Sequence, residues 1–343
     1  MPTVSLSALT TLRVGGRAGS YTRAESAEAL VEAVRACDDA ARPLLVVGGG
    51  SNLVVADDGF RGEVVHVVSR GIDVESDDAC GGVTVRLAAG EPWSEFVDLA
   101  VREGWAGIEC LAGIPGSIGA VPVQNVGAYG QEVASTIAQV RVWDRDAAEV
   151  HTFAAADCGF GYRTSRFKGT TRFVVLEVTL SLRAGEMSEP IAYAELARAL
   201  GVDEGGRAPL ADVRAAVLAL RRSKGMVLDP ADHDTWSAGS FFTNPLLSAA
   251  DAARLPPDAP RWPQQDGRVK TSAAWLIERA GFARGYGEGR PAAVSSKHTL
   301  AITNRGNARA ADVVDLACEL RDGVRAAFGV TLVAEPTLVG LTL

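Results

Sequence analysis

One stretch, residues 107–133, constrains the fold of this chain more than any other. Its sequence, GIECLAGIPGSIGAVPVQNVGAYGQEV, holds six glycines and two prolines, and its only charged residues are Glu109 and Glu132. Glycine inside a helix or strand costs roughly 0.5–1 kcal/mol relative to alanine, so the composition indicates turns. Aliphatic residues lie between the glycines, which favours a buried segment over a surface loop. Because successive glycine amides can form an anion-binding concavity, we expect a buried loop around a phosphate-bearing cofactor.

Composition excludes several classes of protein. The 343 residues predict two or three domains, and a net charge of −8 argues against a duplex nucleic acid partner, which would need a basic face. No apolar run approaches membrane-spanning length, and the N-terminus lacks a secretion signal, so we expect a cytoplasmic protein with no membrane partner. The four histidines are not paired at ligand spacing, so we expect no metal. Scattered cysteines without a C-x-x-C pattern predict reduced, mostly buried thiols at Cys37, Cys80, Cys110, Cys158 and Cys318.

The first third of the chain predicts a helix followed by two strands around a second glycine turn. Helical periodicity covers residues 22–40, with Thr22 and Glu25 as a capping box. The run 44–57 predicts a strand buried on both faces, the turn GGGSN and another strand. That turn could present amides and the Ser51 and Asn52 side chains to a ligand, or it could be a structural hairpin turn. No G-x-G-x-x-G or G-x-x-x-x-G-K-[ST] pattern opens a helix, so a Rossmann site or P-loop is not supported.

The rest of the chain predicts mixed strands and helices. A helix over 209–225 ends in Arg221, Arg222 and Lys224, which would also be expected of simple C-terminal capping. The segment GYRTSRFKG places four cationic or aromatic residues, Tyr162, Arg163, Arg166 and Lys168, in one turn that is either solvated or closely packed. A terminal strand, VTLVA, is expected to end at Glu335. Further strands are predicted over 63–69, 82–90, 136–144, 149–153 and 173–183, and helices over 91–104, 190–201, 271–281 (Thr271 as N-cap) and 311–328.

Five blocks in order resemble one family. GGGSN, GIPGSIGAVPVQNVGAYGQEV, GYRTSRFK, AGSFFTNP and LVAEP are similar to the UDP-N-acetylenolpyruvoylglucosamine reductases (MurB), flavoenzymes of peptidoglycan synthesis, from Leu12 to about Leu341. The resemblance implies an α+β, three-domain flavoenzyme whose two-lobed FAD-binding region has the vanillyl-alcohol-oxidase (PCMH-like) fold, with a C-terminal α+β substrate domain. The expected domains are residues 1–68 (completed by the C-terminal strand 330–343), 69–228 with a substrate-covering insertion at 186–228, and 229–329.

The resemblance also implies two cofactors and one substrate. FAD would be held without a covalent bond, NADPH would be the reductant, and UDP-N-acetylglucosamine enolpyruvate would be reduced to UDP-N-acetylmuramate by a monomer. The first FAD turn would be formed by Gly48, Gly49, Gly50, Ser51 and Asn52. The second turn and the adjoining wall would be formed by Ile114, Pro115, Gly116, Ser117, Gly119, Ala120, Asn125, Gly127, Ala128 and Gly130.

The family's active-site positions fall on Tyr162, Arg163, Ser240 and Glu335, and the last three are expected to be catalytic. Ser240 is expected to be the general acid that protonates the second carbon, because a weak hydroxyl acid can serve a strongly basic carbanion placed within about 3 Å. Arg163 is expected to hold the developing enolate and its carboxylate with a bidentate fork. Glu335 is expected to be protonated, or linked through hydrogen bonding, while that charge develops. Substrate contacts are implied for Tyr162, Tyr193, Lys224, Asn244 and Lys270, whereas the contact of Glu278 and the role of His298 stay open.

Two other functions are compatible with the same fold. A flavin oxidase or dehydrogenase acting on a hydroxy acid or sugar would turn over with oxygen and ignore NADPH. A sensor that keeps FAD but has lost catalysis would be expected to lack Arg163, Ser240 or Glu335, and all three are present.

Overall fold

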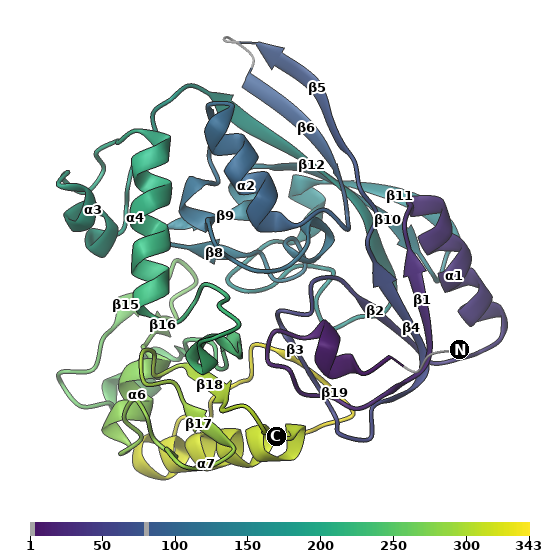
Figure 1. Ribbon diagram of the computed structural model, residues 1–343. Coiled ribbons are helices and arrows are strands. Elements are labelled where there is room, and N and C mark those ends of the chain that lie inside the picture. The colour runs from purple at the N-terminus through teal and green to yellow at the C-terminus, as the bar shows by residue number, and fades with distance from the viewer. Residues whose placement is uncertain (1–3, 79–81) are drawn as a thin grey trace. The chain divides into compact units, whose positions relative to one another are not determined.

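The computed structural model describes residues 4–78 and 82–343, and these divide into two compact units (Figure 1). Of the described residues, the first unit joins 4–18, 50–60 and 228–343, and the second joins 19–49, 61–78 and 82–227. The three-domain division expected from the sequence stays a prediction. Cys80 lies outside the described residues. Within them, no helix is both long and apolar enough to cross a membrane.

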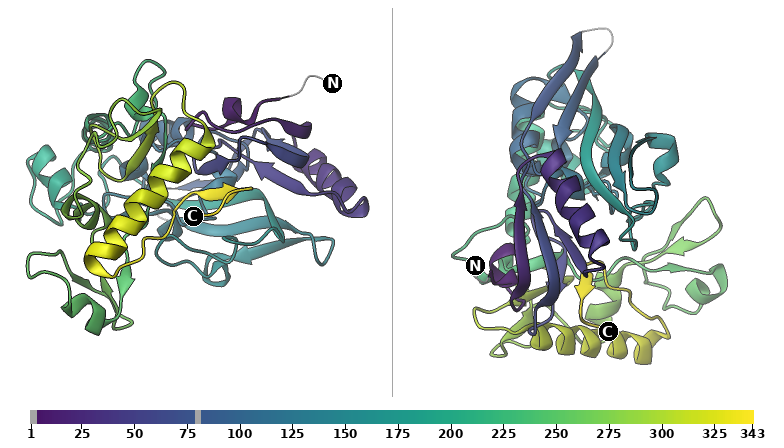
Figure 2. Two further views of the ribbon diagram at one scale, coloured as in Figure 1. Left: turned by 90° about the horizontal axis from the view of Figure 1, so that it is seen from below. Right: turned by 90° about the vertical axis from the view of Figure 1, so that its right-hand side faces the viewer.

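The second unit is built on two sheets. The smaller sheet has the order β1 (Ala18–Ala24), β4 (Phe60–Val67), β2 (Leu44–Val47), with β2 and β4 parallel. Helix α1 (Ala27–Asp39) runs alongside it (Figures 1 and 2), and its buried Leu30 and Val34 join the core. The helix begins at Ser26, whose hydroxyl accepts a bond from the Ala29 amide, so the predicted Thr22 cap is wrong. Thr22 lies in β1 and donates to Glu63 instead.

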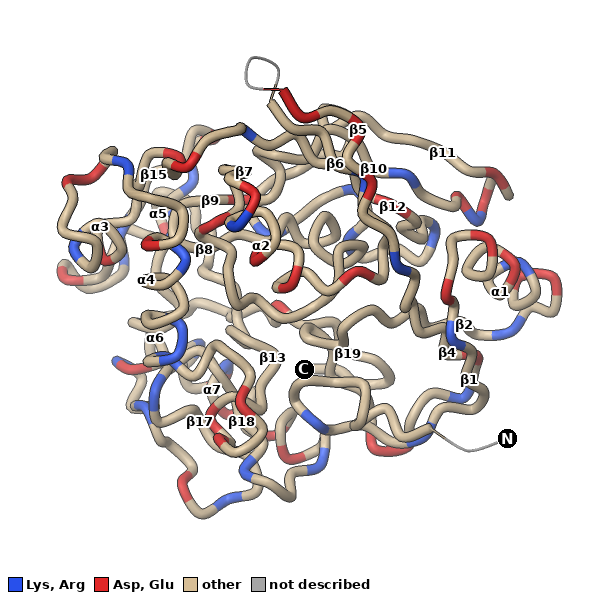
Figure 3. Tube along the Cα trace, turned by 45° about the horizontal axis from the view of Figure 1, so that its top comes forward, with Lys and Arg blue, Asp and Glu red and all other residues tan. Residues whose placement is uncertain are grey.

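The larger sheet of this unit is antiparallel and carries most of the core. Its strand order is β11 (Glu149–Ala154), β10 (Ile137–Asp144), β12 (Phe173–Ala184), β6 (Gly82–Ala88), β5 (Ile72–Asp78), with β7 (Trp105–Ala106) paired to the end of β12. Strand β5 was not predicted, because Ile72 and Val74 are its only apolar residues; in the structure every residue of this edge strand is exposed. Its acidic residues, coloured red along the trace in Figure 3, discourage pairing with a further strand.

Three helices and one hairpin complete the second unit. Helix α2 (Trp93–Arg102) begins after Pro92, and α4 (Leu210–Ser223) begins after Pro209, both close to the predicted bounds. Helix α3 (Ala194–Leu200) is shorter than predicted, because Pro190 to Tyr193 precede it as extended chain. The β8 (Gly127–Ala128) and β9 (Gln131–Glu132) hairpin lies inside the glycine-rich segment.

The first unit contains shorter strands and one long helix. Strands β13 (Ser237–Ser240), β18 (Ala301–Asn304) and β17 (Ala292–Val294) form one sheet, on which α7 (Ala310–Phe328) packs (Figure 2). Another sheet has the order β14 (Leu246–Leu247), β16 (Val269–Lys270), β15 (Trp262–Pro263). Helix α6 (Ala273–Arg279) is capped by Ser272 rather than by the predicted Thr271, and α5 spans Ala249–Ala253.

A parallel pair joins distant parts of the sequence within the first unit. Strand β3 (Leu53–Val55) pairs with β19 (Thr337–Val339). The predicted strand VTLVA is wrong: residues 330–333 have no regular structure, Ala334 forms one isolated bridge to Phe242, and the strand follows Pro336. A hairpin turn joins two strands that pair with each other. GGGSN joins β2 to β3, but β2 pairs with β4 and β3 pairs with β19, so GGGSN is not a hairpin turn. Strand β2 is half-buried rather than buried on both faces.

Candidate active site

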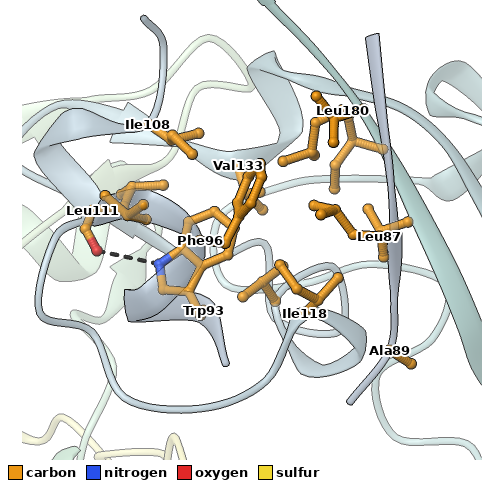
Figure 4. Close-up of a cluster of buried hydrophobic side chains, with 14 of the residues drawn as sticks. Leu87, Ala89, Trp93, Phe96, Ile108, Leu111, Ile118, Val133 and Leu180 are labelled. Atoms are coloured by element: carbon orange, nitrogen blue, oxygen red, sulfur yellow. Dashed lines mark hydrogen bonds between the residues drawn. The ribbon is translucent and has the colours of Figure 1, made fainter. Parts of the chain in front are cut away.

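The glycine-rich segment of the second unit is anchored on a buried hydrophobic cluster, as predicted. Ile108, Leu111 and Ile118 are fully buried beside Trp93 of α2 (Figure 4). The Trp93 indole nitrogen donates to the Leu111 carbonyl at 3.2 Å. The stretch 113–116 between these anchors is half-buried. The segment is therefore a fixed loop with a partly open turn.

The two predicted cofactor turns of this unit pack backbone against backbone. A Cβ added at Gly49 would lie 2.6 Å from the Gly116 Cα, and one at Gly48 would lie 2.2 Å from the Ser117 hydroxyl. The Gly49 contact is with backbone, so only glycine permits that approach, whereas at Gly48 the Ser117 hydroxyl would have to rotate away. The amides of both turns are thereby brought into one region, which is the arrangement that a diphosphate requires.

Gly119 fixes the far end of the second turn. Its amide donates to the Ala89 carbonyl at 2.8 Å, and a Cβ there would lie 2.7 Å from the Ala89 side chain. Ile118 donates in the same way to the Glu91 carbonyl. These two amides are therefore used within the protein, where they fix the turn beside the end of β6, and the FAD contacts expected for this turn stay a prediction.

Arg163 lies against the wall of the same segment. Its guanidinium donates from Nη2 to the Gly127 carbonyl at 2.6 Å and from Nη1 to the Asn125 carbonyl at 3.3 Å. The backbone of Arg163 has a φ of +51°, a left-handed conformation that is uncommon for a residue with a side chain. The guanidinium also lies 5.7 Å from the ring of Tyr162. Of the two readings of this turn, close packing is the one observed.

The Asn125 side chain forms hydrogen bonds that fix the part of the glycine-rich segment around residues 125–134. Its amide nitrogen donates to Glu132 at 2.8 Å and to the Gly161 carbonyl at 3.1 Å, and its Oδ1 accepts from the Ala134 amide. Asn125 too has a positive φ, of +46°. Sequence reasoning placed Asn125 at the cofactor but assigned no role to Glu132. The signal was available, because Glu132 is one of two charges in an otherwise uncharged stretch.

Two of the predicted substrate residues meet at Tyr129. The rings of Tyr193 and Tyr129 make an edge-to-face contact with centroids 5.4 Å apart, and the Lys224 Nζ lies 5.6 Å from the Tyr129 ring. Lys224 also pairs with Glu195 at 2.6 Å, so its side chain does not cap the end of α4. Burial raises the pKa of Tyr129 to about 12, which keeps its hydroxyl neutral. Sequence reasoning missed Tyr129.

Arg221 of α4 is not the solvated dipole partner suggested by its position. Burial lowers the pKa of its guanidinium to about 10, and Nη2 donates to the Met226 carbonyl at 2.7 Å. Its Nε is buried without a hydrogen-bond partner among the described residues. Cys110 is inert for the same physical reason, because burial raises the pKa of its thiol to about 12.

In the first unit, Ser240 and Glu335 lie on neighbouring backbone segments. Ser240 ends β13, and the carbonyl of the next residue, Phe241, accepts the Glu335 amide at 2.9 Å. Asn52 adjoins the same place, because its Nδ2 donates to the Glu335 carbonyl at 3.4 Å and its carbonyl accepts from Thr337. A residue predicted for the cofactor thus adjoins two predicted for catalysis.

Other predicted residues of the first unit have clear structural partners. Gly50 has a φ of +59°, and a Cβ there would lie 1.7 Å from the Leu9 carbonyl, so only glycine fits. The Asn244 Oδ1 accepts from the Ala273 amide at the start of α6. Lys270 pairs with Leu246 across β14 and β16, with its Nζ 6.0 Å from the Trp262 ring. Glu278 accepts a bond from Thr299.

Two family models match this chain. Residues 19–153 match an FAD binding domain, and residues 229–339 match the C-terminal domain of UDP-N-acetylenolpyruvoylglucosamine reductase. Together with the two glycine turns in contact, the first match defines an FAD-dependent flavoprotein.

Relatives of known function extend over the whole chain. The UDP-N-acetylenolpyruvoylglucosamine reductase of Thermobifida fusca is 55% identical over 99% of this chain and 98% of its own length. The corresponding protein of Streptomyces avermitilis is 54% identical over 98% of this chain and 94% of its own length. The crystal structure of the Thermus caldophilus reductase (MurB) covers 98% of both chains, with 26% identity and a TM-score of 0.66. The chain belongs to the UDP-N-acetylenolpyruvoylglucosamine reductase family, which confirms the resemblance and the fold class.

Proposed function

We propose that this chain reduces the enolpyruvyl double bond of UDP-N-acetylglucosamine enolpyruvate with electrons from NADPH, giving UDP-N-acetylmuramate. It is an oxidoreductase of peptidoglycan precursor synthesis, a UDP-N-acetylmuramate dehydrogenase. When bound, FAD supplies the hydride relay between the nicotinamide and the substrate. A hydroxy-acid oxidase is not favoured, because the relatives over the whole chain are reductases.

Ser240 is the proposed proton donor. Addition of hydride to the terminal alkene carbon leaves negative charge on the neighbouring carbon and its carboxylate. A hydroxyl is acidic enough to protonate such a carbanion if it is held at hydrogen-bond distance. The position of Ser240 at the end of β13, fixed by main-chain bonds on both sides, supports this role.

Arg163 and Glu335 are the proposed stabilisers of the enolate. Preorganised donors aimed at developing charge provide a large share of catalysis in many enzymes. The carbonyl bonds of Arg163 fix its guanidinium plane in advance, and a fork of that kind suits a carboxylate. Glu335 can donate a hydrogen bond only in its protonated form, so the proposal requires a neutral carboxyl during the reaction.

The remaining contacts are proposed from the family positions. Tyr193 and Lys224, which both pack against Tyr129, would hold the diphosphate of the sugar nucleotide, with Tyr162, Asn244 and Lys270 as further substrate contacts. We also propose a monomer in the cytoplasm without nucleic acid or membrane partners. Light scattering on a size-exclusion column, with and without substrate, tests the monomer.

The observation that carries the proposal is the backbone bond joining the Ser240 and Glu335 segments, in a chain whose relatives share its whole length. An anaerobic double-mixing experiment tests it. The yellow protein meets one equivalent of NADPH while the flavin absorbance is followed, and UDP-N-acetylglucosamine enolpyruvate is then added. We expect bleaching and a substrate-dependent return of colour. Colour that returns only with oxygen would favour an oxidase and overturn the substrate assignment.

A further inference from the structure

Glu109 is a buried carboxylate to which the reaction gives no role. It lies in the short 3-10 helix Glu109–Leu111 and is 0% exposed. Three N–H groups donate to it: the Gly107 amide to Oε2 at 2.7 Å, and the Gln131 side chain and the Glu189 amide to Oε1, each at 2.9 Å. No arginine, lysine or histidine of residues 4–78 and 82–343 forms an ion pair with it. Burying a carboxylate is costly unless its oxygens are hydrogen-bonded, so these three bonds fix their donors firmly.

The three donors come from three different segments. Gly107 begins the glycine-rich segment, Gln131 belongs to the β8–β9 hairpin, and Glu189 lies in the insertion 186–228, four residues before Tyr193. Gln131 returns a second bond, because its Oε1 accepts the Cys110 amide at 2.8 Å. Glu109 is therefore the point at which the cofactor segment, the hairpin and the insertion are joined by hydrogen bonds.

The hairpin and the insertion also meet through aromatic packing. Tyr129, two residues before Gln131, contacts the Tyr193 ring and the Lys224 ammonium. Tyr129 has a φ of +49°, a strained conformation that persists only when its surroundings hold it. The placement of Tyr193 and Lys224 thus depends on the segments that Glu109 joins.

We propose that Glu109 is a positioning residue that fixes the insertion 186–228 against the cofactor-binding segment, and so sets the position of Tyr193 and Lys224 for the sugar nucleotide. The inference rests on the proposed function for the identity of that ligand. Glu109 acts through the Gly107, Gln131 and Glu189 contacts and need not touch substrate itself.

The first variant is Glu109→Gln. Its amide has one acceptor oxygen and one NH₂ group, so at least one of the three donors must face another donor. We expect the KM for UDP-N-acetylglucosamine enolpyruvate and the FAD dissociation constant each to rise about tenfold, as loss of one hydrogen bond predicts, with kcat reduced less than KM is raised. Glu103→Gln, an exposed glutamate six residues earlier, is the matched control and should leave both constants unchanged.

The second variant is the exchange Glu109→Gln with Gln131→Glu. The glutamine at position 109 can donate from its NH₂ group to the carboxylate at position 131, and its oxygen can still accept from the Gly107 amide. The same NH₂ group then faces the backbone N–H of Glu189, so the bond from Glu189 stays lost. We therefore expect the FAD dissociation constant to return to the wild-type value while KM stays about tenfold high. This separation is not expected of a residue that only stabilises the fold.

Each other outcome overturns the inference. If Glu109→Gln behaves like Glu103→Gln, the carboxylate positions nothing, and if the exchange restores both constants together, the Glu189 bond has no role in binding. If Glu109→Gln does not fold, the exchange variant alone decides, and failure of both to fold would make Glu109 a folding residue. A wild-type enzyme that ignores the sugar nucleotide would instead refute the proposed function, so the two failures are distinguishable.

Discussion

Arg163 and the Ser240–Glu335 pair are held in place by different kinds of bonds. Arg163 is positioned by its own side chain, which donates to the carbonyls of Asn125 and Gly127. Ser240 and Glu335 are positioned by the main chain: Ser240 pairs with Ala301, and the Glu335 amide bonds to Phe241. A change of side chain at Ser240 therefore alters chemistry alone, whereas a change at Arg163 alters chemistry and local structure together.

Ser240→Ala is expected to have the largest effect. Loss of the proton donor should slow reoxidation of the reduced flavin by substrate by about 10²–10⁴-fold. Bleaching by NADPH and the melting temperature should stay at wild-type values, because the β13 pairing does not use the hydroxyl. Stopped-flow absorbance measures the two flavin reactions, and a thermal scan measures the melting temperature. A lower melting temperature would contradict the conclusion that the Ser240 side chain has no structural role.

Arg163→Lys should reduce kcat by about 10²–10³-fold, because an ammonium cannot replace the fixed fork. It should also lower the free energy of unfolding by about 1.5–3 kcal/mol, since two bonds from a charged donor are lost. Steady-state kinetics and urea unfolding are the measurements. An unchanged unfolding free energy would mean that Arg163, like Ser240, is positioned by backbone alone.

Gly50→Ala tests how strictly the main chain of the first unit is fixed. Its Cβ would collide with the Leu9 carbonyl, so we expect a loss of stability about 1–3 kcal/mol larger than that of a matched control. The control is Gly201→Ala, where φ is +68° and nothing lies within 4 Å of the added Cβ. Equal melting temperatures for the two variants would show that the loop near Leu9 yields easily.

Asp144→Asn should have the smallest effect and a pH signature. Hydrogen bonds from Arg172 lower the pKa of Asp144 to about 2, below the usual value near 3.8. A lowered pKa in the folded state contributes stability that is present above about pH 4 and is lost as the pH falls toward 2. Urea unfolding at pH 7 and at pH 3 should show a smaller difference for the variant than for wild type.

The sequence predicted the elements with strong periodicity and the residues within specific motifs. Strands β10, β11 and β12 and helices α2, α4 and α7 lie where expected, because their apolar patterns are unambiguous. The exposed strand β5 has only two apolar residues, Ile72 and Val74, and the true caps Ser26 and Ser272 lie four residues and one residue, respectively, from an equally suitable Thr. Local sequence cannot decide between two capping residues when packing fixes where the helix begins.

The sequence predicted which residues belong to the candidate site, but it did not predict which of them contact one another. The glycines of 48–50 and 113–119 were expected near one ligand, yet nothing in the sequence states that Gly49 packs on Gly116. Glu109 and Tyr129 lie inside a recognised motif, but their partners, Glu189 and Tyr193, are distant in sequence. Contacts of this kind depend on tertiary folding rather than on local pattern.

The parallel pairing of β3 with β19 has a consequence for synthesis of the chain. Residues 53–55 leave the ribosome early, but their partners are residues 337–339, almost the last to be translated. The second unit, by contrast, is complete once residue 227 has been made. Because loop closure over such a separation is slow, vectorial folding should finish with the first unit. A nascent chain arrested shortly before residue 337 would leave β3 unpaired, and Asn52 would lack the hydrogen bond that its carbonyl accepts from Thr337.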